Sequence, residues 1–350
     1  MNHAPRHQKN APPRRLPLWL AFGADVLAAG LLLCAVALTG FVLPGLRSRN
    51  QAPVAVITPP PVTAEIAQAE PGHMADSAGP RSAEETKTPW QQRFAEHFSD
   101  TVESTDHSYR SPTLSVEIST HSITLRGYPQ VWYVADIYLS RIESFRTWAA
   151  EGSFTTLTRA PMEQLSAETG AVLSTNGDYC GAQAYGGFYV RNGQVFSTEP
   201  TGCDICVLYA DGTMETYAAW DYSVEDILAR SPWQVWKFGP RLLDEEGRAL
   251  ERFQVSEAIY GCNPRSAIGY YEPGHYCLVV ADGRDEDWAL GLSLPDFAKI
   301  FEELGCRCAY NLDGGASAVM AFQGRLYSRQ SAPREIGDIL LIREAEEGTE

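Results

Sequence analysis

The chain has 350 residues, of which 44% are hydrophobic, and a formal net charge of −16. A protein that binds nucleic acid needs a basic surface, because much of its affinity comes from Lys and Arg contacts to phosphate. The composition therefore predicts no nucleic-acid partner, and an anionic substrate would need a local cluster of arginines.

The N-terminal segment is first basic and then apolar. Residues 1–15 carry four basic residues and no acid, and residues 16–43 contain Asp25 as their single charge. About 20 apolar residues suffice to cross a bilayer as a helix, and a basic flank stays in the cytoplasm. The pattern predicts a cytoplasmic arm, a single-pass signal anchor in the cell membrane and an extracytoplasmic remainder. The alternative is a cleaved signal peptide, since Ala35-Val36-Ala37 resembles a cleavage site.

The segment that follows is rich in Pro, Ala, Ser, Thr and Glu. Residues 44–110 show no regular apolar pattern. A segment of this composition buries too little apolar surface to offset the loss of chain entropy, so we expect a flexible, disordered stalk. Residues 111–345 have the patterning of a folded domain, and residues 346–350 are expected to be a tail.

Short apolar runs in residues 111–345 indicate strands, and two segments indicate helices. The expected strands are residues 114–118, 131–139, 187–191, 206–210, 267–271, 276–281, 318–322 and 338–343. The expected helices are residues 223–230, which begin with a Ser cap, and residues 293–304, which have Pro295 in the first turn and Gly305 after the end. These elements predict one α+β domain on a single mixed sheet, with a sizeable core.

Seven cysteines lie beyond the apolar segment. An exported protein would favour disulfides, but spacing alone does not give their pairing. Cys203-Asp-Ile-Cys206 has the spacing of a redox or metal motif, yet no second cysteine pair or histidine cluster accompanies it. A structural role is favoured.

Four polar clusters lie at strand ends or turns of the domain. They are Asn176-Gly-Asp178, Asn263-Pro-Arg265-Ser266, Asp282-Gly-Arg284 and Asn311-Leu-Asp313-Gly314-Gly315-Ala-Ser317. Each alone is explained by turn chemistry or by a surface ion pair. Together they would place amides, carboxylates and arginines in one site.

In order and approximate spacing, these clusters resemble the motifs of the phosphodiester glycosidase family. The resemblance covers about residues 111–344 and implies a hydrolase that removes a sugar from a glycosyl phosphodiester in envelope or exopolysaccharide glycans. Cys180, Ser266 and Ala316 stand where the family commonly has an aromatic residue, Thr and Gly. These departures keep the polar groups and concern the finer substrate contacts.

The chemistry that the resemblance implies assigns roles to the clusters. A phosphodiester leaving group is weakly basic, so one carboxylate could suffice as general base, and the separation of a pair would decide between inversion and retention. The candidate catalytic residues are Asp313, Asp178 and Asp282. Arg265 and Arg284 could contact phosphate, helped by backbone N–H groups of the glycine pair. The candidate substrate-binding residues are Asn176, Arg265, Arg284, Asn311, Gly314, Gly315 and Ser317.

Three alternatives stay open at this point. The three aspartates could hold a hard divalent cation, Ca²⁺ or Mg²⁺, although no EF-hand spacing is present and no other cofactor is indicated. The chain could be a non-catalytic glycan-binding or envelope-assembly protein that keeps the fold. It could also be a phosphodiesterase that attacks phosphorus rather than carbon.

Overall fold

A computed structural model describes residues 55–57, 87–154, 158–178, 187–332 and 334–345. The predicted cytoplasmic arm (residues 1–15), membrane anchor (residues 16–43) and tail (residues 346–350) lie outside these ranges. Within them, no helix combines the length and the apolar character that a membrane span requires.

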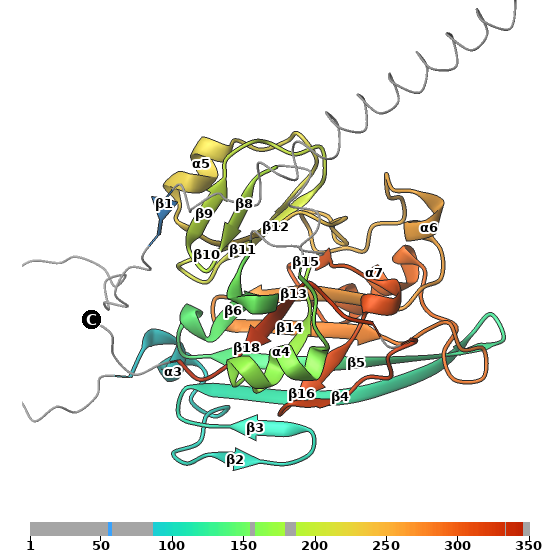
Figure 1. Ribbon diagram of the computed structural model, residues 1–350, viewed down its shortest axis with the longest axis horizontal. Coiled ribbons are helices and arrows are strands. Elements are labelled where there is room, and N and C mark those ends of the chain that lie inside the picture. The colour runs from blue at the N-terminus through green and yellow to red at the C-terminus, as the bar shows by residue number, and fades with distance from the viewer. Residues whose placement is uncertain (1–54, 58–86, 155–157, 179–186, 333, 346–350) are drawn as a thin grey trace, which may run out of the picture. The chain divides into compact units, whose positions relative to one another are not determined.

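The described strands form three antiparallel sheets (Figure 1). The seven-stranded sheet has the order β15 (Cys308–Asn311), β13 (Arg265–Glu272), β14 (His275–Ala281), β5 (Tyr128–Leu139), β4 (Leu114–Leu125), β3 (Ser108–Arg110) and β2 (Glu103–Ser104). The six-stranded sheet has the order β1 (Ala55–Val56), β9 (Gln194–Ser197), β8 (Tyr189–Arg191), β12 (Pro232–Trp236), β10 (Ile205–Tyr209) and β11 (Met214–Tyr217). The five-stranded sheet has the order β17 (Arg325–Leu326), β16 (Met320–Phe322), β7 (Leu173–Asn176), β18 (Asp338–Ile342) and β6 (Phe145–Ala149).

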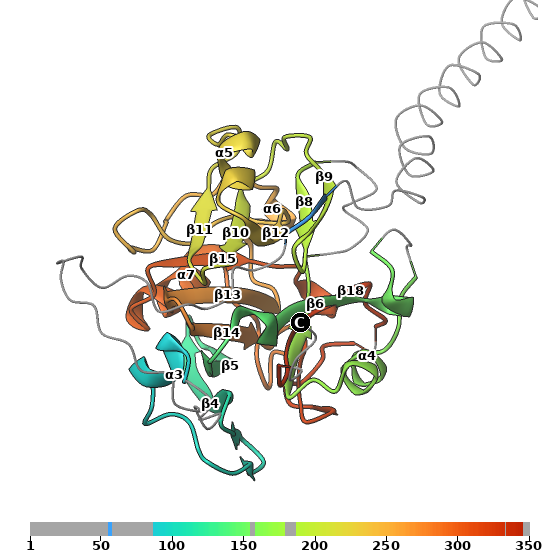
Figure 2. The ribbon, with the colours of Figure 1, turned by 90° about the vertical axis from the view of Figure 1, so that its left-hand side faces the viewer.

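The helices are few and short. They are α3 (Pro89–Arg93), α4 (Met162–Thr169), α5 (Val224–Ala229), α6 (Glu257–Tyr260) and α7 (Leu294–Glu303), with 3-10 turns at Ile142–Ser144, Ala150–Gly152 and Gly315–Ser317. The Ser293 hydroxyl accepts a hydrogen bond from the backbone of Asp296 and caps α7. The apolar face of α7 packs with side chains of β13 and β14 (Figure 2).

The secondary structure agrees with the sequence, and the sheet arrangement does not. All eight expected strands and both expected helices are present. The expectation of a single mixed sheet is wrong, because the described strands pair antiparallel in three sheets and the domain is mostly β. Short connections explain the difference: β4 meets β5 through Arg126 and Gly127, whereas parallel strands need crossovers of a dozen or more residues.

The folded domain also includes residues that we assigned to the stalk. Thr88 caps α3 in a capping box, and Phe94 is buried against Tyr138, with the ring centroids 5.1 Å apart. Strands β2 and β3 continue the seven-stranded sheet beyond β4. The apolar residues between Trp90 and Phe98 were the sequence signal for this packing.

One buried core joins the three sheets. It contains Ile268 of the seven-stranded sheet, Leu208 of the six-stranded sheet and Leu340 of the five-stranded sheet. The polar clusters lie at or next to the ends of β7, β13, β14 and β15.

Candidate active site

The loop after β15 contains the Asp313 cluster. The backbone conformation and close packing of this loop require glycine at positions 314 and 315. Gly315 has φ 63°, and its N–H donates to the Pro264 carbonyl at 2.9 Å. A Cβ at Gly314 would lie 2.9 Å from the same carbonyl oxygen. The Gly314 N–H donates to the Asp313 carboxylate at 2.9 Å, so both N–H groups that we expected at a phosphate have partners inside the protein.

Asn176, at the end of β7, fixes this loop from the five-stranded sheet. Its Nδ2 donates to the Asp313 carbonyl at 2.6 Å, and its Oδ1 accepts from the Val319 N–H at 3.2 Å. The backbone of Asp313 also donates to the Gly177 carbonyl at 3.2 Å. The first and last sequence clusters are therefore in direct contact.

The two remaining clusters adjoin the same loop. The Leu312 N–H donates to the Ser266 carbonyl at 2.8 Å. The exposed Arg284 guanidinium lies against Gly315 and donates to the Asn263 side chain at 3.2 Å. The structure thus brings all four clusters together, although not every side chain faces the same space.

A small cavity is lined by Asp313 and by residues of the neighbouring strands. Its volume is about 10 Å³, which is about the space of one water molecule. Desolvation raises the pKa of Asp313, while the Ser317 hydroxyl and the charges of Arg334 and Arg159 act in the opposite direction. The lining residues are Arg159, Asn176, Gly177, Asp313, Ser317, Ile336, Gly337 and Asp338.

Sequence reasoning missed two charged residues that line this cavity, Asp338 and Arg159, and a third that acts on Asp313, Arg334. Asp338 is the first residue of β18 and is 2% exposed, and its carboxyl group fills the space that a Cβ at Gly177 would need. Arg159 lines the cavity, and Arg334 is close enough to lower the pKa of Asp313. None of the three belongs to one of the four polar clusters. From the sequence, Asp338 was identified only as the first residue of an apolar strand.

Asp178 lies in a different environment from the one we expected for a catalytic carboxylate. Its Oδ1 pairs with the fully buried Arg191 guanidinium at 2.5 Å, and its Oδ2 accepts from the Lys237 N–H at 3.0 Å. One oxygen is therefore engaged by β8 of the six-stranded sheet and the other by the residue that follows β12. This geometry makes Asp178 a link between two sheets, and it does not line the cavity.

Asp282 is also engaged by protein donors. Its Oδ2 accepts from the Tyr133 hydroxyl at 2.9 Å and from Trp288 Nε1 at 2.8 Å, and its Oδ1 accepts from the Arg329 N–H at 3.1 Å. Desolvation raises the pKa of this carboxyl group. The geometry assigns Asp282 to holding the surrounding loop.

Arg265 is buried, and its donors are used by backbone carbonyls. Its Nε donates to Leu292 at 2.9 Å, and its Nη2 donates to Ile259 at 2.6 Å. Desolvation lowers its pKa to about 10. Asn311 is used similarly, because its Nδ2 donates to the Gly239 carbonyl at 2.8 Å. Neither side chain is presented to the cavity, so the phosphate contact expected of Arg265 has no geometric support.

The three aspartates do not gather into a metal site. Within the described ranges, no group of three or more His, Cys, Asp or Glu side chains is placed to hold a metal ion. The six described cysteines, Cys203 and Cys206 included, are free thiols.

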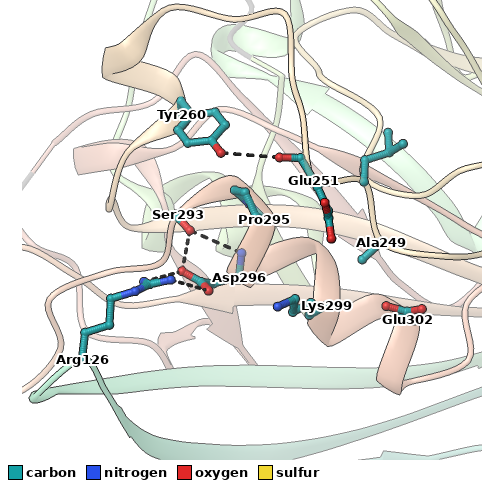
Figure 3. Close-up of a pocket in the computed structure, with 10 residues that line it drawn as sticks. Arg126, Ala249, Glu251, Tyr260, Ser293, Pro295, Asp296, Lys299 and Glu302 are labelled. Carbon is teal, nitrogen blue, oxygen red and sulfur yellow. Dashed lines mark hydrogen bonds and ion pairs between the residues drawn. The ribbon is translucent and has the colours of Figure 1, made fainter.

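A second, larger cavity of about 590 Å³ lies between α6 and α7 (Figure 3). Arg126 reaches it from the β4–β5 turn and pairs with Asp296 through two contacts of 2.8 and 3.1 Å. No side chain of the four clusters lines it. We therefore place the candidate active site at the Asp313 cavity and not at the larger one.

The architecture is that of a mostly-β domain in which one carboxylate-containing loop is fixed by two neighbouring sheets. Residues 169–343 match the phosphodiester glycosidase family, and this range includes all four clusters. The chain belongs to the phosphodiester glycosidase family.

Solved structures with the same fold include the catalytic domain of zebrafish N-acetylglucosamine-1-phosphodiester alpha-N-acetylglucosaminidase, auto-inhibited by its pro-peptide. That match has a TM-score of 0.56 and 21% identity, and it covers 70% of this chain and 88% of that chain. A hypothetical protein from Synechocystis matches with a TM-score of 0.52 and 14% identity, over 70% of this chain and 64% of that chain. At these identities the likeness shows the fold alone.

A curated relative is the SPbeta prophage-derived uncharacterized protein YomE of Bacillus subtilis (strain 168). It is 25% identical over 178 residues, which are 50% of this chain. The match spans only 27% of that relative's length.

Proposed function

We propose that this protein hydrolyses a glycosyl phosphodiester and that Asp313 is its general base. Family membership supports the reaction type. The observation that carries the residue assignment is that Asp313 lines a water-sized cavity and lies near the positive charges of Arg159 and Arg334.

The reaction needs a water molecule, a base and a group that accepts negative charge. The base must be ionised, and the arginines favour the ionised form of Asp313, while burial makes that form a stronger base. Asp313 takes a proton from the water molecule while the water oxygen attacks the anomeric carbon. The bond between that carbon and the phosphate oxygen breaks, and its electron pair leaves with the phosphate.

Arg159 and Arg334 take the phosphate-binding role that we had expected of Arg265. A guanidinium group offers planar, charge-assisted hydrogen bonds to phosphate, and its charge offsets the strongly acidic surface of the chain. Asp338 also lines the cavity and is the second carboxylate that can accept a hydrogen bond from the same water.

The test uses the full chain and the methyl ester of N-acetylglucosamine 1-phosphate, with release of free sugar as the signal. Wild-type protein should release it, and Asp313→Asn should lower kcat by at least about 100-fold, the usual size of a general-base contribution. Asp287→Asn, an exposed carboxylate outside the cavity, is the matched control. Full activity of Asp313→Asn would refute the assignment.

Reaction in ¹⁸O-labelled water separates the proposed chemistry from attack on phosphorus. Label in the released sugar supports a glycosidase, and label in the phosphate supports a phosphodiesterase. Retention on a glycan without any turnover would favour the non-catalytic alternative. Parallel reactions with a chelator and with added Ca²⁺ or Mg²⁺ decide whether a divalent cation contributes.

We further propose that the protein acts outside the cytoplasm on envelope or exopolysaccharide glycans, anchored by residues 16–43. The support is the apolar sequence with its basic flank. Proteolysis of intact cells should remove the domain while alkaline extraction leaves the N-terminal fragment in the membrane. A domain that resists protease until the cells are broken would refute this location.

A further inference from the structure

Two buried cysteine side chains meet between β14 and the segment that follows α7. Cys277 lies in β14 and is fully buried, and Cys306 lies two residues before β15 and is 3% exposed. Their sulfur atoms are 3.8 Å apart. Among the six described cysteines, this is the pair whose sulfur atoms are in contact. The neighbouring Cys308 instead donates to the Met214 carbonyl at 3.3 Å.

A glycine of the adjacent strand makes room for both sulfur atoms. Gly269 of β13 lies opposite Cys277 in the register of the two strands. A Cβ at Gly269 would lie 2.7 Å from the Cys277 sulfur and 2.8 Å from the Cys306 sulfur, which is too close for atoms that are not bonded. Glycine weakens the interior of a strand, and it often marks a place where another part of the chain approaches closely. Both thiols therefore occupy one site, in the space that a side chain at Gly269 would fill.

We propose that Cys277 and Cys306 form a disulfide bond when the chain folds in an oxidising compartment. Such a bond is about 2.05 Å long, so the sulfur atoms must approach by about 1.8 Å, which rotation about the two Cα–Cβ bonds supplies. Structural disulfides persist in exported proteins, which agrees with the location that we propose for this domain. The bond does not depend on the proposed hydrolase activity.

The oxidant is a second disulfide, carried by a small thiol or by a thiol oxidoreductase. One cysteine thiolate attacks this disulfide, forms a mixed disulfide and releases one thiolate of the oxidant. The second cysteine thiolate attacks the protein sulfur of the mixed disulfide, which forms the bond and releases the other thiolate. Two protein thiols are thereby oxidised, one disulfide is reduced, and the two protons pass to the released thiolates. Because both sulfur atoms are buried in the folded domain, the exchange precedes the packing of α7 onto β14.

The bond closes a loop that contains α7 and the Asp282-Gly-Arg284 cluster. Its two cysteines are 29 positions apart, and closing a loop of this length restricts the unfolded chain. The bond also fixes the C-terminal end of α7, where the Cys306 N–H donates to the Phe301 carbonyl at 3.0 Å. The chain then enters β15, which leads to the Asp313 loop. The disulfide should therefore stabilise the part of the fold that positions Asp313.

The test refolds the full chain from urea in two detergent buffers, one with reduced and oxidised glutathione and one with dithiothreitol. Remaining thiols are blocked with N-ethylmaleimide in denaturant, and trypsin then digests the protein without reduction. The two cysteines fall on separate peptides, residues 266–284 and 300–307, and cleavage after Arg307 separates Cys306 from Cys308. Mass spectrometry should find the two peptides linked in the glutathione sample and separately blocked in the dithiothreitol sample.

The two samples should also differ in stability. The oxidised form should unfold at a Tm higher by roughly 5–15 °C, the shift expected when a loop of about 30 residues is closed in a domain of this size. Cys306→Ala should abolish the difference between the two buffers. Cys308→Ala is the matched control, because it removes a buried thiol two positions away whose partner is a backbone carbonyl, and it should keep the difference.

Mapping the wild-type peptides decides the matter even where a variant does not fold. Blocked thiols on both peptides of the glutathione sample would refute the bond, and so would a link from either peptide to a different cysteine. Linked peptides together with equal Tm values in the two buffers would refute the stabilising role.

Discussion

At the scale of single residues, burial decides what the acidic side chains do. Asp178, Asp282 and Asp313 are three carboxylates in similar sequence contexts. Asp178 pairs with Arg191 and Asp282 accepts three hydrogen bonds, whereas Asp313 lines a cavity. Of the three, only Asp313 lines the small cavity, and this is why we propose Asp313 as the general base.

Replacing Asp313 by Asn should lower the hydrolytic activity and raise the stability of the fold. Because burial raises the pKa of Asp313 in the folded protein, ionisation favours the unfolded chain, and stability falls as the pH rises through the raised pKa. Asp313→Asn carries no charge to bury, so at pH 7 its Tm should exceed that of wild type.

Calorimetry at several pH values checks this expectation. The difference in Tm should shrink below the pH at which an unfolded Asp becomes protonated, because both proteins are then neutral at this position. A Tm difference that is independent of pH would show that the Asp313 charge is not the cause. The same pKa shift predicts that wild-type activity falls on acidification at a pH above the ordinary pKa of Asp.

The buried Arg191–Asp178 pair should be sensitive to loss of the arginine alone. Arg191→Met leaves an unpaired carboxylate in the core and should lower the free energy of unfolding by about 3–5 kcal/mol. Adding Asp178→Asn removes the unpaired charge, so the double variant should recover part of that loss. Urea denaturation measures the free energy of unfolding of the single and the double variant. A double variant that is less stable than Arg191→Met would contradict the pairing.

At the scale of elements, the local pattern of apolar residues predicts where the strands lie but not how they are grouped into sheets. The run 276–281 is continuous and apolar because β14 lies between β13 and β5 and is buried, and this could be predicted from the sequence. The division into three sheets could not, because it depends on which strands pair across long stretches of chain. The same limit applies to the candidate site. Shared motifs led to Asp313, whereas Asp338 enters the cavity only through the pairing of β18 with β7.

The cysteines of these elements should differ sharply in reactivity. Cys277 of β14 and Cys306 are buried with their sulfur atoms 3.8 Å apart, and burial raises the pKa of the Cys277 thiol. Cys203 and Cys262 are exposed. Since the thiolate is the reactive form, iodoacetamide on the reduced native protein should label Cys203 and Cys262 and spare Cys277 and Cys306.

Mass spectrometry of tryptic peptides reads this pattern directly. Labelling of the two buried cysteines should appear only in denaturant. Equal labelling of all four thiols under native conditions would mean that β14 and the segment before β15 open readily.

At the scale of the whole molecule, the folded domain extends closer to the N-terminus than composition indicates. Residues 87–110 contribute Phe94 to the core and two strands to the seven-stranded sheet. A chain that begins at residue 87 should fold, whereas one that begins at residue 111 loses this packing. Removal of the Phe94 side chain alone should cost about 3–5 kcal/mol.

Thermal unfolding of the two truncated chains tests this boundary. The chain from residue 111 should show a lower Tm and greater aggregation, because truncation uncovers Tyr138 and the edge of β4. Phe94→Ala in the longer chain is the matched control for the lost core contact. Identical Tm values for the two chains would place residues 87–110 outside the cooperative unit.

The contacts that three sheets make around residues 176–178 also bear on how the protein reaches its working state. Asn176 comes from the five-stranded sheet, the Asp313 loop from the seven-stranded sheet and Arg191 from the six-stranded sheet. Contacts so distant along the chain form slowly, because loops must close before the contacts stabilise them. Hydrolysis should therefore be the last property to appear during refolding, after fluorescence and circular dichroism have reached their native values. A molecule with one sheet misplaced would be inactive, so under the proposed function the hydrolysis assay would measure the fraction of fully assembled protein.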